Sequence, residues 1–435
     1  MEYSSSSNVR ILLDSGFFDA QYYSGKYALA LADEEELAGH YLSRFREYPD
    51  PGPFFSGEDY LNFNPDVEKA GVNPLLHYLQ YGMRQARRVL SDETCRKLFE
   101  SVDATRTASL VDIIPRAVRV RVLYTTAGNF FFQDIAEYVA RALESLGWDA
   151  CAMADTDPRE AEKGWFDLVM APHEYMIIGA GAGWNRQRRE NAAYFNTEQW
   201  QTPWFAACFA CLHGSRRGVL DINPTSAAAL GAIGVRAAFL PLLPLERTAF
   251  QQSRATISRS FTRRKYVEEL GYPDDIAARQ YDLLFVANLN ERRQKVLAGL
   301  AADIAPFKSF LHAPVMTTPV KAGDGDMLSG RDFTQLALNS KILLNIHRDD
   351  IGYFEWHRLF LYGIANSALV LTEPSFRPPM LEPGLHYIEA PVEAMPALIR
   401  DLLSTPAGLE RLRGVSAACK ALCEQMDLAA LVMTS

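Results

Sequence analysis

Three side chains in the second half of the chain, His347, Glu355 and Arg358, could bind the ribose and phosphate groups of a nucleotide. A guanidinium group pairs well with a phosphate, and a carboxylate can accept hydrogen bonds from two ribose hydroxyls. The alternative is structural, because Glu355 would also suit the start of a helix and could form an i,i+3 salt bridge with Arg358. The residue types leave both interpretations open.

These side chains lie in a predicted strand–loop–helix–strand unit. Residues 342–346 and 368–372 are short apolar runs typical of buried strands, and residues 354–365 repeat with a helical period. At this length, the pattern predicts a βαβ unit of a parallel sheet. Ligands of such sheets bind beyond the carboxyl ends of the strands and at helix N-termini, where all three side chains fall.

A basic turn follows another predicted strand, residues 281–287. The turn, residues 288–293, reads Asn-Leu-Asn-Glu-Arg-Arg and opens a predicted helix. Arg292 and Arg293 in its first turn would oppose the helix dipole, so they need a different role. Binding a diphosphate is one such role, and a solvated basic turn is the alternative.

The first half of the chain also alternates between strands and helices, which predicts a second parallel sheet. Strands are expected at residues 118–124, 148–154, 166–171, 192–196 and 237–242. The loop TTAGNFFF after the first strand lacks the G-x-G-x-x-G pattern, which argues against a dinucleotide site there. His173, Glu174 and Glu198 lie just beyond strand ends and could face a substrate. Helix capping and hydrogen bonding between domains are the alternative.

Composition restricts the class of function. The net charge of −9 over 435 residues argues against nucleic-acid binding as the main role. No apolar run reaches the roughly 18 residues of a membrane span, and the polar N-terminus lacks a signal-peptide core, so a cytoplasmic protein is expected. The single C-x-x-C pair, Cys208 and Cys211, has no second pair to complete a zinc site.

The first 90 residues contain an internal repeat with an offset of 37 residues. The identical pairs are Phe17 and Phe54, Phe18 and Phe55, Tyr23 and Tyr60, His40 and His77, Tyr41 and Tyr78, and Leu42 and Leu79. Six identities in register indicate a duplicated small helical module, with these residues in its core. A module this short is expected to dock on its neighbour or on a partner.

Several segments resemble known glycosyltransferases. The second copy, with NPDV at 64–67 and GVNPLLHYL at 71–79, is similar to a module attached to bacterial polysaccharide (rhamnosyl-type) glycosyltransferases. Four further segments resemble bacterial GT-B glycosyltransferases of the family-1-type or spore-maturation (CgeB-like) group. They are MAPHEYM at 170–176, YFNTEQW at 194–200, DLLFVANLNERR at 282–293 and KILLNIHRDDIGYFEWHRL at 341–359.

The resemblance covers residues 116 to about 390 and implies a GT-B α/β fold, in which two Rossmann-like domains face a cleft. The predicted domains are a small all-α repeat domain at 1–90, a linker at 91–115, a Rossmann-like acceptor domain at 116–246 and a Rossmann-like nucleotide-sugar domain at 247–435. A protein partner or the inner membrane surface could bind residues 1–90.

The resemblance implies transfer of a sugar from a nucleotide sugar to a cell-surface polysaccharide or a protein, without a cofactor or metal ion. The second domain would bind the donor. Asn290, Arg292, Arg293 and Arg358 would neighbour the diphosphate, Glu355 would hold the ribose or the donor sugar, and His347 would line the pocket. Arginines and a helix N-terminus can stabilise the charge of the leaving diphosphate.

The acceptor hydroxyl and its general base would belong to the first domain. His173 is the best residue type for a base near neutral pH, with Glu174 next. Asn129, Asn196 and Glu198 would lie on the acceptor side.

Other features leave alternatives open. Asp324 and Asp326 form a D-x-D pattern in a glycine-rich stretch that predicts a turn rather than a metal site, and Glu355 starts no E-x7-E pair. Inverting and retaining transfer therefore both remain open. A catalytically silent GT-B-like binding protein and a non-hydrolysing nucleotide-sugar epimerase are the competing functions.

Overall fold

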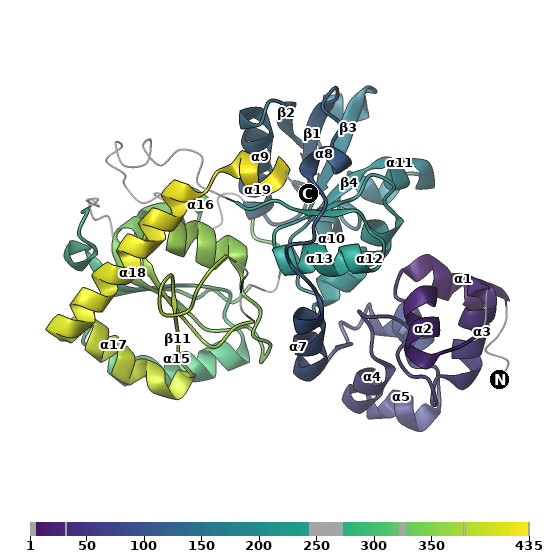
Figure 1. The fold of residues 1–435 in the computed structure, drawn as a ribbon, viewed down its shortest axis with the longest axis horizontal. Coiled ribbons are helices and arrows are strands. Elements are labelled where there is room, and N and C mark those ends of the chain that lie inside the picture. Colours follow the sequence, from purple (N-terminus) through teal and green to yellow (C-terminus); the bar gives the residue numbers. More distant parts are fainter. Residues whose placement is uncertain are drawn as a thin grey trace. The chain divides into compact units, whose positions relative to one another are not determined.

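The computed structural model describes residues 6–30, 33–242, 273–316, 318–321, 328–376, 378 and 380–433. They form two parallel β-sheets with helices, preceded by a helical region, so the predicted α/β class is confirmed (Figure 1). The chain has two compact units, one mainly of residues 1–116 and 166–239, the other of 117–165 and 240–434. The predicted domain boundary at 246/247 lies outside the described residues, as do Asp324 and Asp326.

Short helices make up the N-terminal region. They are α1 (Ser6–Ser15), α2 (Ala20–Tyr27), α3 (Glu34–Arg44), α4 (Gly57–Phe63), α5 (Pro65–Ala70), α6 (Pro74–His77), α7 (Asp92–Ser101) and α8 (Leu110–Ile113). Helices α5 and α6 follow the two Asn-Pro pairs at 64–65 and 73–74. Proline lacks the N–H group that the first turn of a helix leaves unpaired, which explains why α5 and α6 both begin on it.

The two repeat copies share one hydrogen bond in equivalent places. The Tyr23 hydroxyl lies 3.0 Å from Nδ1 of His40, and the Tyr60 hydroxyl lies 2.9 Å from Nδ1 of His77. Both tyrosines are fully buried, as expected for core residues. The duplicated sequence therefore builds a duplicated structure.

The repeat module packs on the α/β fold through another equivalent pair. Phe17 and Phe54 both contact Phe209 of α12 (Pro203–Gly214), with ring centroids 4.8 and 5.2 Å apart. Both phenylalanines are almost completely buried. The module thus docks on its neighbour, one of the two possibilities that its small size predicted.

Each copy also contains an ion pair, but with opposite polarity. In the first copy, Lys26 Nζ lies 2.7 Å from Asp50 Oδ2. In the second copy, Arg87 Nη2 lies 2.8 Å from Asp66 Oδ2. Asp50 and Arg87 occupy the same position of the repeat, so that position is acidic in one copy and basic in the other.

The first sheet has the strand order β2-β1-β3-β4-β5-β6. Its strands are β1 (Arg119–Tyr124), β2 (Asp149–Ala154), β3 (Trp165–Met170), β4 (Ala193–Asn196), β5 (Val219–Asp221) and β6 (Ala237–Phe239). The helices that connect them are α9 (Phe131–Ser145), α10 (Pro172–Tyr175), α11 (Arg186–Asn191), α12 and α13 (Pro224–Ala232). The sequence predicted every strand of this sheet except β5.

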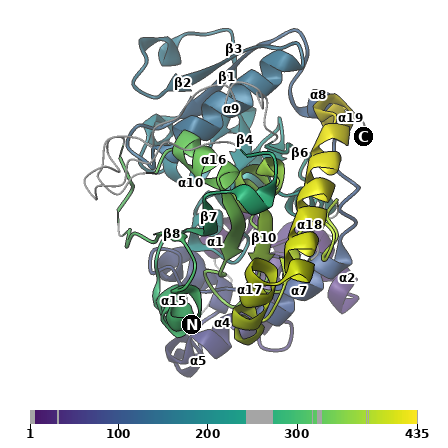
Figure 2. The ribbon, with the colours of Figure 1, turned by 90° about the vertical axis from the view of Figure 1, so that its left-hand side faces the viewer.

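The second sheet has the order β11-β10-β9-β7-β8, with parallel pairs throughout. Its strands are β7 (Tyr281–Val286), β8 (Ser309–His312), β9 (Ser340–Asn345), β10 (Leu369–Thr372) and β11 (Ile388–Glu389). Its helices are α15 (Glu291–Ile304), α16 (Gly330–Leu338), α17 (Met395–Ser404) and α18 (Pro406–Gln425), and α19 (Leu428–Met433) is the last described element of the chain. Helices α15 and α17 lie side by side (Figures 1 and 2).

The segment between β9 and β10 differs from the predicted regular helix. Residues Trp356–Gly363 are π-helical, and Ile364–Asn366 form a 3₁₀ turn. A Cβ atom at Gly363 would lie 2.4 Å from Val370 and 2.9 Å from Leu343, so the backbone lies directly on the sheet. Contact with the sheet decides the geometry of this turn, and such contact is not visible in the periodicity of the sequence.

Candidate functional site

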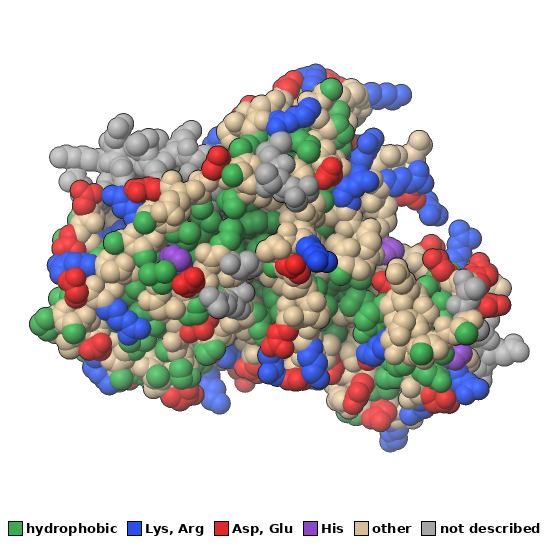
Figure 3. Space-filling model, in the orientation of Figure 1, with side chains coloured by type: hydrophobic (Ala, Val, Ile, Leu, Met, Phe, Trp, Pro, Cys, Tyr) green, Lys and Arg blue, Asp and Glu red, His purple; other side chains and the backbone are tan. Residues whose placement is uncertain are grey.

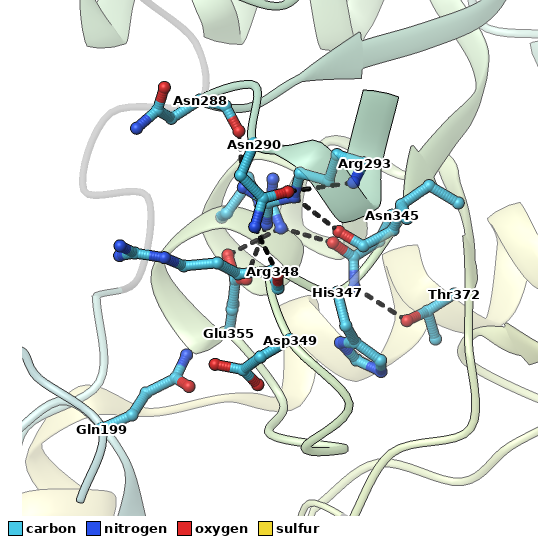
Figure 4. Close-up of polar contacts among 12 residues, drawn as sticks. Gln199, Asn288, Asn290, Arg293, Asn345, His347, Arg348, Asp349, Glu355 and Thr372 are labelled. Carbon is cyan, nitrogen blue, oxygen red and sulfur yellow. Dashed lines mark hydrogen bonds and ion pairs between the residues drawn. The ribbon is translucent and has the colours of Figure 1, made fainter. Parts of the chain in front are cut away.

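The carboxyl ends of β7 and β9 form the topological switch point of the second sheet. In the strand order β8-β7-β9-β10-β11, the chain proceeds from β7 to one side and then returns to the other. In open α/β sheets, such a switch point is where a crevice for ligands is expected. Asn290 joins the loops after both strands. Its Oδ1 caps α15 by accepting a hydrogen bond from the Arg293 N–H at 2.9 Å, and its Nδ2 donates to the Arg348 carbonyl at 2.6 Å (Figure 4).

Glu355 lies between two largely buried arginines at this crevice. Its Oε1 is 3.4 Å from Nη2 of Arg293, and its Oε2 is 2.7 Å from Nη2 of Arg358. Arg293 also donates to the carbonyls of Ile346 at 2.9 Å and Asn288 at 3.0 Å (Figure 4). The contact between Glu355 and Arg358 is the i,i+3 salt bridge of the structural alternative, and both guanidinium groups bind protein atoms.

The electrostatics of this cluster favour an ionised Glu355. Burial alone would raise its pKa, but Arg358 and Arg293 outweigh that effect and hold the pKa below its usual value. Burial also lowers the pKa of Arg293 to about 10, which leaves it protonated at neutral pH. The side chain of Glu355 is 22% exposed, and its oxygens retain lone pairs that can accept ligand hydroxyl groups.

Arg292 and His347 bind the loop that follows β10. Arg292 donates to Glu373 at 2.6 and 3.0 Å, and Glu373 raises the pKa of the guanidinium. Arg292 also donates to Asp350 at 2.8 Å and to the His347 carbonyl at 3.0 Å. The backbone N–H of His347 donates to Glu373 at 2.7 Å, and its ring Nε2 lies 3.2 Å from the Pro374 carbonyl. These contacts fix the shape of the crevice rim.

Arg348 is the basic side chain of this rim that sequence reasoning did not select. It is exposed, and within the described residues no carboxylate pairs with its guanidinium, unlike Arg292, Arg293 and Arg358. Its position directly after His347, two residues beyond the apolar strand, could have identified it as a candidate site residue. The backbone carbonyl of Arg348 lies at the start of α15, and an unneutralised guanidinium suits a diphosphate.

In the first unit, His173 and Glu198 lie together. Ala171, at φ 46°, turns the chain from β3 into α10, which carries His173 and Glu174, both buried. Nε2 of His173 lies 3.5 Å from Oε1 of Glu198. The ring of Trp204, 48% exposed, lies 6.2 Å from the His173 ring and was not selected from the sequence.

Asn196 supports the loop that carries Glu198 through buried hydrogen bonds. It is fully buried and donates from Nδ2 to Asp221 Oδ2 at 2.8 Å and to the Glu198 carbonyl at 3.0 Å. Asp221 also accepts hydrogen bonds from the Ser226 hydroxyl at 2.7 Å and the Asn223 N–H at 2.8 Å. Asn196 therefore holds the loop that carries Glu198 and does not face solvent.

Asp221 is expected to make stability depend on pH. Burial raises its pKa to about 7, although the three hydrogen-bond donors oppose the shift. Because the unfolded-state value is 3.8, the folded chain binds more protons between these two values. The free energy of unfolding should therefore fall by roughly 1–3 kcal/mol as the pH rises from about 4 to about 7. Urea unfolding of wild type and Asp221→Asn across this pH range tests the prediction. The same change in unfolding free energy with pH in both proteins would contradict it.

Asn129 belongs to the second compact unit, whereas His173 belongs to the first. Asn129 Oδ1 accepts a hydrogen bond from the Val320 N–H at 2.9 Å. Lys321 donates to the carbonyls of Thr126 and Gly128 at 3.2 and 3.0 Å. The loop after β1 is thus bound by residues 320 and 321.

Two findings concern the described residues as a whole. They contain no group of three or more His, Cys, Asp and Glu side chains that could hold a metal ion. None of the helices described is both long enough and apolar enough to span a bilayer.

A scan of protein-family models finds no match for this chain, and a search of curated proteins finds none either. Among solved structures, the chain is similar to HepE of Anabaena in complex with UDP, with a TM-score of 0.42, 10% identity, and coverage of 72% of this chain and 97% of that chain. The chain is also similar to an α1,3-fucosyltransferase, with a TM-score of 0.35, 12% identity, and coverage of 77% of this chain and 97% of that chain. For the glycotransferase of kitacinnamycin, the TM-score is 0.33 and the identity 10%, with coverage of 71% of this chain and 96% of that chain. At these TM-scores the function has to be inferred from the chain's own residues.

Proposed function

We propose that the protein is a glycosyltransferase that transfers a sugar from a nucleotide sugar to a glycan of a cell-surface polysaccharide, or to a protein. The observation that carries the proposal is the group of ionised residues at the β7/β9 switch point, where α15 begins. An ionised Glu355 and an unneutralised Arg348 provide a hydroxyl acceptor and a phosphate partner at one crevice. The four segments that resemble GT-B enzymes support the same assignment.

In the donor site, each residue has a distinct role. Arg348 and the first turn of α15 contact the diphosphate, and Glu355 accepts hydrogen bonds from the ribose or the donor sugar. Arg292, Arg293 and Arg358 border the diphosphate and keep the loops after β7, β9 and β10 in place, with Asn290 tying the first two loops together. Preorganised positive charge stabilises the leaving nucleoside diphosphate, because it needs no rearrangement during the reaction.

On the acceptor side, His173 takes the proton of the acceptor hydroxyl as that oxygen bonds to the anomeric carbon of the donor. The bond from the anomeric carbon to the diphosphate oxygen breaks, and the electron pair leaves with the nucleoside diphosphate. Glu198 orients the His173 ring and stabilises its protonated form. Glu174 is the alternative base. No step of this scheme uses a metal ion or cofactor.

Arg348→Ala is expected to weaken nucleotide binding about tenfold or more. A hydrogen bond to a charged group contributes about 1.5–3 kcal/mol, and 1.4 kcal/mol corresponds to a factor of ten in affinity. The ligand is first chosen by thermal shift from UDP, GDP, dTDP, CMP and their sugars, since a ligand at about 100 times its Kd stabilises the protein by about 2.7 kcal/mol. Calorimetric titration of wild type and variant then measures the loss.

Arg411→Ala is the matched control, because Arg411 is also an exposed arginine of the second unit but lies on α18. It should bind the chosen nucleotide as wild type does. Unchanged affinity in Arg348→Ala would refute the assigned phosphate partner, and no shift from any nucleotide would refute the donor site. Isomerised nucleotide sugar formed without an acceptor would indicate an epimerase.

A further inference from the structure

Trp204 is an exposed aromatic side chain next to the proposed base. All six tryptophans of the chain lie in the described residues, and Trp204, at 48% exposed, faces solvent more than the others do. The other five are buried or half-buried: Trp148, Trp165, Trp184, Trp200 and Trp356. Exposed apolar side chains are ordinary on protein surfaces, and those in Figure 3 lie among charged ones. A role for Trp204 therefore has to come from its surroundings.

The start of α12 holds Trp204 in a fixed place. Thr202 caps the helix, because its hydroxyl accepts a hydrogen bond from the Phe205 N–H at 3.1 Å, and Pro203 is the first helical residue. Phe205 is fully buried and stacks on Phe209, with ring centroids 5.1 Å apart. Because the backbone on both sides of Trp204 is anchored, ordering this side chain on a ligand costs little entropy.

The face of the Trp204 ring is not covered by a cation within the described part of the chain. Two other tryptophans differ in this respect. Cζ of Arg119 lies 3.9 Å from the centroid of the Trp165 ring, and Cζ of Arg188 lies 3.8 Å from that of Trp184. The face of an indole carries partial negative charge, which attracts weakly positive C–H groups as well as cations. The uncovered face of Trp204 can therefore pack on C–H groups of a ligand.

The ring that neighbours Trp204 is that of His173, the proposed base. The ring centroids lie 6.2 Å apart and the planes are tilted by 44°, so the two rings meet at an angle and do not stack. A sugar ring has C–H groups on its faces and hydroxyl groups around its edge. When it packs on the indole, it presents a hydroxyl at its edge to the imidazole. Trp204 and His173 thus offer the two contacts that a sugar acceptor needs, one for its face and one for its hydroxyl.

On the basis of the glycosyl transfer proposed above, we propose that the acceptor is a glycan whose sugar ring packs on Trp204. The indole binds the C–H face of that ring, and His173 receives the proton of a hydroxyl at its edge. A serine or threonine of a protein acceptor carries its hydroxyl on a short chain and has no ring face to pack there. Trp204 thus selects a glycan over a protein, a choice that the residues of the donor site do not make.

Acrylamide quenching of the tryptophan fluorescence of the full chain tests this contact without any nucleotide. The probes are the methyl glycosides of glucose, galactose, mannose, rhamnose and N-acetylglucosamine, with a serine-containing peptide as the comparison. At least one glycoside should lower the quenching constant of wild type, because a bound sugar shields the exposed indole, and the peptide should not. Trp204→Ala should lose this protection and, by calorimetric titration, bind the same glycoside about tenfold more weakly. Trp204→Phe, which keeps an aromatic ring, should bind it with intermediate affinity.

Trp165→Phe is the matched control, because Trp165 is half-buried beneath Arg119 and belongs to the other compact unit. It should keep the protection that wild type shows. Turnover provides a second readout, with the donor that thermal shift selects. Trp204→Ala should raise KM for the glycan acceptor about tenfold and leave KM for the nucleotide sugar unchanged, a split that loss of folding would not produce.

Three results would overturn the glycan contact. They are absence of protection by every glycoside, protection that survives in Trp204→Ala, and equal protection by the peptide. Turnover of the nucleotide sugar with a peptide acceptor alone would overturn the contact while supporting the transferase. Protection of Trp204 in a chain that binds no nucleotide would refute the transferase and leave the glycan contact standing.

Discussion

Glu355→Ala is expected to lower the free energy of unfolding by about 3–5 kcal/mol, the cost of leaving buried charges without their partner. Glu355 lies between Arg293 and Arg358, whose side chains are 5% and 12% exposed. Without the carboxylate, two positive charges at the β7/β9 crevice would repel each other in a poorly solvated place. Urea unfolding of wild type and variant measures the difference.

Glu393→Ala is the matched control, since Glu393 is an exposed glutamate of the same unit. It should change stability by less than about 0.5 kcal/mol. The pH dependence offers a second check. Because the folded-state pKa of Glu355 is lowered, its stabilising contribution is complete above the unfolded-state value of 4.5 and is lost as the pH falls through the folded-state value. A Glu355→Ala protein as stable as the control would show that the arginines find other partners.

His173→Ala is expected to reduce kcat by about 100- to 10,000-fold, the usual contribution of a general base. The scheme makes His173 the residue that accepts the proton of the acceptor hydroxyl. Affinity for the nucleotide should not change, because His173 and the donor crevice belong to different compact units. Turnover can be followed as release of the nucleoside diphosphate, with the nucleotide sugar that thermal shift selects.

Glu198→Gln separates a positioning role from a structural one. The amide keeps the size of the side chain but lacks the negative charge beside His173, so kcat should fall, though less than in His173→Ala, while affinity for the nucleotide stays unchanged. If His173→Ala turns over normally while Glu174→Gln does not, the base is Glu174. Full activity in both variants would favour the binding protein over the enzyme.

The elements of the fold were predictable because most strands are apolar runs long enough to recognise. The βαβ unit around Glu355 and the basic turn before α15 both appear where the sequence placed them. The same pattern predicted that Glu355 and Arg358 lie near the carboxyl ends of strands. Local spacing is sufficient for such statements, because it determines which residues share one end of a parallel sheet.

The partners of the site residues could not be predicted in the same way. Arg292 and Glu373 are 81 positions apart, and nothing in their local sequence indicates that they pair. Asn196 appeared to be a polar residue at a strand end. In the structure its amide is fully buried and donates to Asp221, which lies 25 positions further along the chain. Long-range hydrogen bonds therefore decide which polar side chains remain available to a ligand. Arg348 is one that remains available.

The opposite polarity of the ion pairs in the two repeats has a consequence for folding. Similar neighbouring repeats can misassemble by exchanging segments. If the closing segments of the two copies were exchanged, Asp50 would face Asp66 and Arg87 would face Lys26. Both contacts would bring like charges together. The reversal of charge thus disfavours the exchanged pairing relative to closure of each copy on itself.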